Sequence, residues 1–226
     1  MRPTRRDFLG LLAGAGALAG FAGPSKRTVR ISVLLSPDSA PGRGAELAVD
    51  EARRAAELLG AGFELVPPAE EALAVVGPRA GTSDLPYLVA STPYESLVHR
   101  KIFQVASSLR HRGDALIGKE GLEVVDWHPS LVRFGAEQLN QRYTEKFGEP
   151  MKEAAWRAWM AVKIVTEAAL RSPDGDLLTA LTTLQFDGHK GVPLWFHPET
   201  HQLVQPMYLV DRKGKVVGEV EPEEEG

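Results

Sequence analysis

Apolar residues recur with two different periods along residues 29–66. The stretch 29–35 alternates around Ile31 and Val33, which predicts a strand that ends in the Pro- and Gly-rich stretch 37–42. Glycines close a following helix, after which residues 63–66 are short and strand-like. A strand, a helix and a strand in this space predict a βαβ unit with a parallel pair. The helix carries an apolar stripe at steps of three and four, formed by Ala45, Ala48, Val49, Ala52, Ala55, Ala56 and Leu59.

The later pattern predicts more short strands and two long helices. One helix has an apolar face made by Val132, Ala136, Leu139, Tyr143 and Phe147. The next helix, over residues 151–171, has a buried stripe made by Ala154, Ala158, Ala161, Val162, Val165, Ala168 and Ala169. A short helix is expected over 176–184, and strands are expected at 72–76, 87–90, 102–106, 122–127, 192–196, 203–210 and 216–220. Short strands separated by turns and helices predict an α/β fold built on a parallel sheet.

Several stretches of this pattern resemble a known family. Residues 36–39 read SPDS, and GRGAELAV follows at 42–49. The later blocks are LNQRYTEKFGEP at 139–150, AWRAWMAV at 155–162 and FDGHKGVPLWF at 186–196. In order and spacing they resemble the type I periplasmic solute-binding proteins, the branched-chain amino-acid class of transporter receptors. The resemblance implies an α/β fold in which a ligand binds between two lobes.

Two parts of the chain are shorter than the pattern of this family. Residues 79–85 stand where the receptors place a full helix, and residues 107–120 stand where they hold several strand–helix units. The resemblance therefore implies a reduced fold: a parallel-sheet lobe over 23–106, a truncated second lobe with two long helices and a terminal hairpin over 107–220, and an acidic tail at 221–226. A subgroup associated with pyrroloquinoline-quinone-dependent alcohol oxidation resembles this chain in DWHP at 126–129, AWMAV at 158–162 and QLVQP at 202–206.

An export signal is expected at residues 1–22. Thr4-Arg5-Arg6-Asp7-Phe8-Leu9 resembles the twin-arginine motif S/T-R-R-x-F-L and precedes a short apolar run rich in Gly and Ala. The alternative is a general secretory signal with a chance pair of arginines. Both interpretations predict a soluble periplasmic protein once the signal is removed, because no second apolar stretch could anchor the chain.

Composition and charge narrow the classes of site and partner. The chain has 226 residues, of which 43% are hydrophobic and 25% charged, which predicts a packed core. It has no cysteine, which excludes disulfides, thiolate metal sites, a cysteine nucleophile and a lipid-modified cysteine. A net charge of −4 without a basic stripe argues against nucleic acid as a partner.

The resemblance implies a ligand site in the loops that follow the first, third and fourth strands. Hydroxyl groups and free amides in such loops hold a carboxylate or a hydroxyl of the ligand. The alternative is that these residues only cap helices and shape turns. The candidate ligand contacts are Ser36, Thr82, Ser91, Thr92 and Tyr94.

Histidine and tryptophan supply the other candidate chemistry. His197 and His201 have the spacing of a metal pair, but Pro198 places them in a hairpin turn, and zinc would also need His189 or Glu199. We therefore expect no metal site. Trp156 and Trp159 are not expected to face the same core, so one of them is expected at a cleft or partner surface. The tryptophans could also stack on a ring ligand or anchor the core: Trp127, Trp156, Trp159 and Trp195.

Two functions remain open at this point. The sequence contains no G-x-S-x-G, P-loop or H-E-x-x-H motif, so we expect neither an enzyme nor a cofactor. The first function is a periplasmic receptor that delivers a small organic solute to a membrane permease. The second is an accessory protein that has lost the solute site and docks on a periplasmic oxidoreductase. The loop over 77–86 separates them, because a receptor needs a polar floor there.

Overall fold

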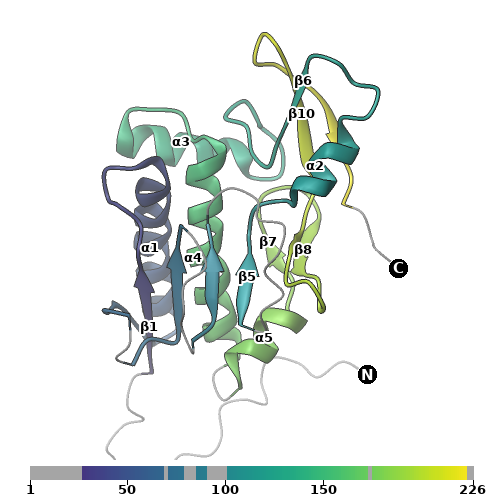
Figure 1. The fold of residues 1–226 in the computed structure, drawn as a ribbon. Helices are drawn as coiled ribbons and strands as arrows, with labels where there is room; N and C mark the ends of the chain where they lie inside the picture. Colours follow the sequence, from purple (N-terminus) through teal and green to yellow (C-terminus); the bar gives the residue numbers. More distant parts are fainter. Residues whose placement is uncertain (1–26, 69–70, 79–84, 91–100, 173–174, 223–226) are drawn as a thin grey trace, which may run out of the picture.

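A parallel sheet forms the centre of the protein. The computed structural model describes residues 27–68, 71–78, 85–90, 101–172 and 175–222. The sheet has the order β2-β1-β3-β4-β5, and all neighbouring strands are parallel (Figure 1). This confirms the predicted βαβ unit and the three strands after it, with ends shifted by one or two residues. The strands are β1 (Thr28–Val33), β2 (Gly62–Leu65), β3 (Ala74–Gly77), β4 (Tyr87–Val89) and β5 (Ile102–Gln104).

Helix α1 (Ala40–Leu58) connects β1 and β2. The Ser39 side chain accepts a hydrogen bond from the Gly42 amide at 3.1 Å, which satisfies a free donor of the first turn. The predicted apolar stripe of α1 is buried from Ala45 to Ala56, with one exception. Ala55 is exposed, and so is Leu59, the last residue of the predicted stripe. Leu59 is the C-terminal cap and no longer follows the helical spiral. Ala55 lies with Arg53 and Arg54 on the exposed side of α1, while Ala52 and Ala56 face the core.

Helix α4 (Glu153–Arg171) packs against α1 and against the sheet, so it is buried on opposite sides. The expectation that only one of Trp156 and Trp159 would be buried is wrong, because they are 0% and 1% exposed. Trp156 stacks on Trp127 with ring centroids 5.6 Å apart. The Trp159 indole nitrogen lies on another side of the helix and donates to Glu51 at 2.8 Å. Both tryptophans therefore serve as core anchors.

Helix α3 (Ala136–Phe147) is shorter than the apolar pattern predicts. Val132 is not part of its buried face; it precedes the helix and is 64% exposed. Phe134 and Gly135 have φ values of 56° and 86°, and a right-handed helix cannot continue backwards through such residues. Ion pairs fasten α3 to α1, with Lys146 at 2.9 Å from Glu46 and Arg142 at 3.0 Å from Glu51.

Two small antiparallel sheets complete the fold. One has the order β11-β10-β6 and lies beyond the carboxyl end of β5 (Figure 1); its strands are β6 (Leu122–Val125), β10 (Met207–Asp211) and β11 (Val216–Val220). The other is β7 (Phe186–Asp187), β8 (Pro193–Phe196) and β9 (Leu203–Val204). The single strand expected over 203–210 is therefore two strands, which separate at Gln205 and Pro206, where proline lacks the amide needed for a ladder. The closing hairpin is confirmed by the β10–β11 pairing.

The pattern also missed helix α2 (Leu109–Ala115). Seven residues with a single buried side chain, Ala115, carry no apolar stripe. Ser108 caps the helix by accepting from the His111 amide at 3.1 Å. Ala115 packs with Val124, Met207 and Leu209 on one face of the smaller β6 sheet.

One hydrophobic cluster joins the parallel sheet, α1, α3, α4, α5 (Leu177–Thr183) and the β7–β8–β9 sheet. The helices expected for the second lobe thus pack against α1, and the division between residues 106 and 107 stays a prediction. Across the described residues, no helix is both long and apolar enough to cross a membrane.

Candidate functional site

A cavity of about 620 Å³ lies beside the carboxyl ends of β4 and β5. Its lining includes Val89 and Gln104, the last residues of those strands. Helix α2 and the segment from the β8–β9 turn to β10 supply the other walls. Ligands of parallel α/β sheets bind at this edge, because the strand ends and their loops converge there. The volume falls within the range of small-molecule sites.

Ser107 is the most informative residue of the lining. It is 3% exposed, and its buried hydroxyl makes no well-formed hydrogen bond among the described residues, although the Ser107 side chain lies close enough to Asp126 to help lower the pKa of that carboxyl. Its amide donates to the two Asp126 carboxylate oxygens, each at 3.3 Å, which fixes the backbone. A buried hydroxyl without a well-formed hydrogen bond costs free energy that a polar atom of a ligand can recover.

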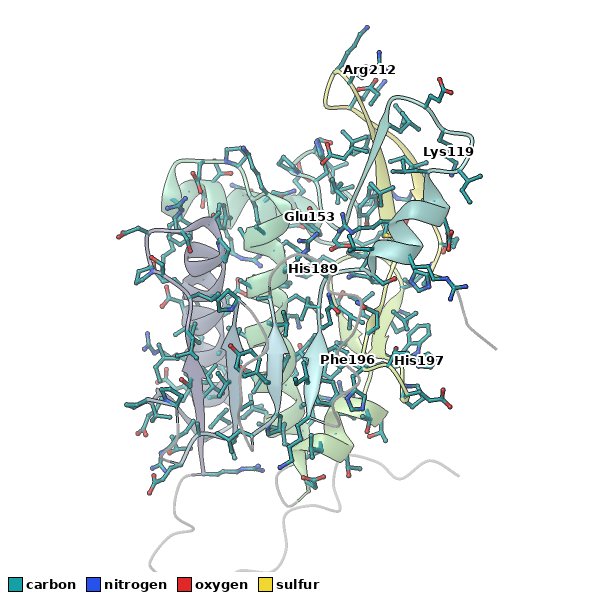
Figure 2. The ribbon with its side chains drawn as sticks, viewed as in Figure 1. Lys119, Glu153, His189, Phe196, His197 and Arg212 are labelled. Atoms are coloured by element: carbon teal, nitrogen blue, oxygen red, sulfur yellow. The ribbon has the colours of Figure 1, made fainter. Side chains whose placement is uncertain are left out.

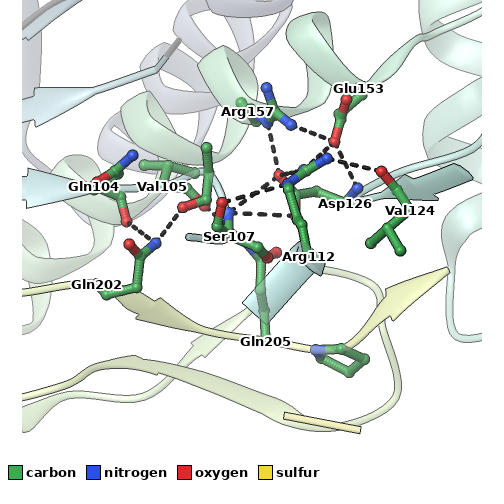
Figure 3. A network of polar contacts seen from close by, with 12 residues as sticks. Gln104, Val105, Ser107, Arg112, Val124, Asp126, Glu153, Arg157, Gln202 and Gln205 are labelled. Carbon is green, nitrogen blue, oxygen red and sulfur yellow. Dashed lines mark hydrogen bonds and ion pairs between the residues drawn. The ribbon is translucent and has the colours of Figure 1, made fainter. Parts of the chain in front are cut away.

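Two glutamines fasten the C-terminal wall of the cavity to the chain that continues β5 (Figure 3). The Gln202 side-chain amide donates to the carbonyl oxygens of Gln104, at 3.3 Å, and Ala106. The Gln205 amide donates to the Val105 carbonyl at 2.7 Å. This wall is therefore held by side-chain hydrogen bonds and by one isolated backbone bridge, in which the Gln104 amide donates to the His201 carbonyl at 2.9 Å, rather than by a continuous strand ladder.

A buried ion network lies behind Ser107 (Figure 3). Asp126 is fully buried and accepts from Arg157 at 2.7 Å, with Arg112 also at 2.7 Å. Glu153 pairs with both arginines and accepts from the Asp126 amide at 2.7 Å. Burial alone would raise the pKa of Asp126, but Arg157, Arg112 and Lys190 outweigh it and lower that pKa to about 2. Asp126 is therefore ionised at neutral pH and joins β6, α2 and α4.

Lys190 adds a buried amino group on the far side of Gln205. Its ammonium donates to the Gln205 side-chain oxygen and the Pro206 carbonyl, each at 2.8 Å. It also lies 4.3 Å from the centroid of the Trp156 ring. Burial lowers the pKa of Lys190 to about 7, against the opposing effect of Asp126. Lys190 fixes the orientation of the Gln205 amide, so that amide can only donate toward Val105.

The cavity has charged residues of both signs in its lining, with Asp114 and Glu221 beside the basic residues, and its walls are apolar. Arg110 and His111 lie on α2, Lys119 follows it, and Arg110 pairs with Asp114 at 3.7 Å. Apolar wall residues are Val89, Ile102, Leu203, Met207 and Val220. Such a site fits a small molecule with an apolar body and a polar or anionic end.

Five residues were expected from the sequence to contact a ligand. Among the described residues, none of them lines this cavity. Ser36 is exposed after β1, and its carbonyl accepts from the Ser39 hydroxyl at 2.6 Å, which is a turn role. Gly42 approaches that carbonyl so closely that an added Cβ would lie 1.9 Å from it. The remaining candidates fall outside the described residues: Thr82, Ser91, Thr92 and Tyr94.

The sequence did not single out the residues that do line the cavity. Ser107 gave no signal beyond its position after a strand. Gln202 and Gln205 lie in the QLVQP stretch, which carried a resemblance but no site assignment.

His197 and His201 lie in the predicted turn, here between β8 and β9. The His201 amide donates to the His197 carbonyl at 2.9 Å, and the His201 ring stacks on Phe103 with centroids 4.4 Å apart. Within the described ranges, no group of three or more His, Cys, Asp and Glu side chains is placed to hold a metal ion.

Comparison with solved structures identifies the architecture. An ABC transporter substrate-binding protein from Sphaerobacter thermophilus superposes with a TM-score of 0.68 at 13% identity, covering 87% of this chain and 98% of that protein. The fold is that of the periplasmic binding proteins. This confirms the α/β fold that the sequence motifs imply. No family model matches the sequence, and no curated protein is significantly similar to it.

Two further periplasmic binding proteins show the same likeness together with a bound molecule. The branched-chain amino acid transporter protein of Streptococcus pneumoniae, in complex with isoleucine, has a TM-score of 0.62 at 15% identity and covers 88% of this chain and 99% of its own. A solute-binding protein of Rhodopseudomonas palustris, in complex with 3,4-dihydroxybenzoic acid, has a TM-score of 0.65 at 9% identity, with coverages of 86% and 98%. These neighbours are substrate-binding proteins rather than enzymes, and at such identities they establish the fold of this chain.

Proposed function

We propose that this protein is a periplasmic solute-binding protein, without enzymatic activity, that holds a small organic acid in the cavity beside Ser107 and presents it to an ABC-type permease. The fold supports the general class. The observation that carries the proposal is a cavity of suitable size that is lined in part by Ser107, whose buried hydroxyl makes no well-formed hydrogen bond. The cavity also lies at the edge of the sheet where α/β proteins bind ligands.

The lining suits a small molecule with an apolar body and a carboxylate end. The apolar walls suit a hydrocarbon or aromatic body, and Lys119 suits a carboxylate. Arg110 and Asp114 pair with each other at 3.7 Å, and Glu221 is the other carboxylate of the described lining. The neighbours were solved with isoleucine and with benzoic acid derivatives, so both classes belong in the test. Ser91, Thr92, Tyr94 and Thr82 remain proposed additional contacts.

Ser107→Ala is expected to change stability and binding in opposite directions. Without ligand, the variant should be as stable as the wild type or slightly more stable, because it removes a buried polar group that makes no well-formed hydrogen bond. With ligand, it loses one hydrogen bond and should bind about 3–10-fold more weakly. Thermal unfolding and titration calorimetry measure the two effects, using benzoate, 3,4-dihydroxybenzoate and isoleucine as probes.

Thr183→Ala is the matched control, since Thr183 is exposed on α5 and does not line the cavity. It should leave affinity unchanged. We also expect no micromolar binding of isoleucine. An isoleucine signal abolished by Ser91→Ala with Thr92→Ala would instead restore the plain amino-acid receptor. Failure of every probe to bind would contradict the organic-acid proposal and favour the accessory role on an oxidoreductase.

A further inference from the structure

The outer end of the β6–β10–β11 sheet carries a cluster of cations around one apolar side chain. We call this cluster the basic tip, and it consists of Ile117, Lys119, Arg212, Lys213 and Lys215. All five residues are exposed, and Ile117 is 75% exposed. Figure 2 shows Lys119 and Arg212 at the same end of the molecule. The chain as a whole has a net charge of −4, so the basic tip is opposite in sign to the rest of the protein.

The two loops that form the basic tip lie against each other. A Cβ placed on Gly121 would be 2.9 Å from the Arg212 Nε atom, so the Arg212 side chain crosses the loop that carries Ile117 and Lys119. Gly118 and Gly121, at φ values of 68° and 75°, give that loop a shape that other residues rarely adopt. The cations and the isoleucine therefore belong to one surface.

The hairpin turn is built rigidly. The Asp211 carboxylate accepts from the amides of Lys213 and Lys215, each at 2.9 Å, and the Gly214 amide donates to the Asp211 carbonyl at 2.9 Å. Asp211 is thus occupied with the backbone of the turn, while the lysine side chains extend into solvent. Glu120 and Glu123 are nearby exposed acids in sequence, so with Asp211 three acids stand against the four cations of the basic tip, which leaves an excess of one positive charge.

We propose that the basic tip docks the protein on an anionic lipid membrane surface. Cations attract the phosphate headgroups, and a single exposed isoleucine among them can enter the interface. A purely electrostatic protein partner would need the cations but would give no role to Ile117. This proposal does not depend on solute binding, because vesicle binding and ligand binding are measured separately.

The experiment is co-sedimentation of the full chain with vesicles. One set contains equal parts of phosphatidylcholine and phosphatidylglycerol, and the other contains phosphatidylcholine alone. The wild type should bind the anionic set and release it at high salt. Charge reversal by Arg212→Glu, Lys213→Glu and Lys215→Glu should weaken that binding at least about tenfold. Ile117→Ser should weaken it at every salt concentration at which the wild type still binds.

The matched control reverses three exposed cations elsewhere, by Arg53→Glu, Arg54→Glu and Lys152→Glu. It has the same net charge and the same N-terminus as the test variant. It should keep wild-type binding to within about twofold. Should the triple variant fail to fold, Lys213→Gln with Lys215→Gln provides a milder form. Equal losses in test and control variants, equal binding to both vesicle sets, or no binding to either would overturn the proposal.

Discussion

Asp126→Asn is expected to lower the free energy of unfolding by about 3–5 kcal/mol. The substitution keeps the shape of the side chain but removes the charge that faces Arg157 and Arg112, both at 2.7 Å. Arg157 is 4% exposed and cannot reach water instead. Removing one member of a buried ion group costs more than the group contributes, because it leaves the other charges uncompensated. Urea unfolding monitored by tryptophan fluorescence measures the change.

The pH dependence gives a second signature of the same residue. The folded-state pKa of Asp126 is about 2, below its ordinary value of 3.8, so its stabilising contribution is present above the ordinary value. That contribution is lost as pH falls from about 4 toward 2. The difference between wild type and Asp126→Asn should therefore narrow over this range. Were it constant down to pH 2, ionised Asp126 would not be the source of the stability.

Asp114→Asn is the control for Asp126. Asp114 pairs with Arg110 at 3.7 Å on the exposed side of α2, and such pairs contribute little. We expect a change below about 0.5 kcal/mol. If both variants lost similar amounts of unfolding free energy, the buried ion network would contribute no more to stability than an exposed ion pair.

Gly44→Ala is expected to destabilise the protein by about 1–3 kcal/mol or more, because α1 and α4 touch at this glycine. An added Cβ would lie 2.0 Å from the carbonyl oxygen and 2.8 Å from the Cα of Ala155. Those are backbone atoms, so no side-chain rotation relieves the clash and the helices must separate. Thermal or urea unfolding would show the loss.

Gly113→Ala provides the opposite case within a helix. No heavy atom lies within 4 Å of a Cβ built at Gly113 on α2. Alanine should therefore stabilise the helix by up to about 1 kcal/mol through its higher propensity. The two glycine-to-alanine substitutions are expected to change the free energy of unfolding in opposite directions. A stabilising Gly44→Ala would show that the contact between α1 and α4 is looser than described.

The fold was largely predictable because its elements are encoded locally. The alternation around Ile31 and the spacing of Ala45 to Ala56 are sufficient for a βαβ unit, whatever the rest of the chain does. Prediction failed where backbone conformation or packing on two sides decides the outcome. Positive φ at Phe134 and Gly135 makes α3 begin later than the apolar pattern predicts, and burial of α4 on opposite sides accommodates both Trp156 and Trp159.

The candidate site was much less predictable. Ser107 and Gln205 are brought together by the packing of the C-terminal strands beside β5, a contact between segments nearly a hundred residues apart. Neither residue belongs to a short motif whose spacing reports a chemical role. Ser107 is held by the Asp126 carboxylate, and Gln205 by the Val105 carbonyl and Lys190; no periodic pattern reveals these partners.

The contact between Gly44 and Ala155 also determines when α1 can pack during protein synthesis. Helix α1 is made early, yet the surface that covers it belongs to α4, more than a hundred residues later in the chain. At about 5–20 residues per second, the ribosome needs roughly ten seconds to produce that partner. During this delay the alanine-rich face of α1 is exposed to chaperones, and the final structure can form only after almost the whole chain has emerged.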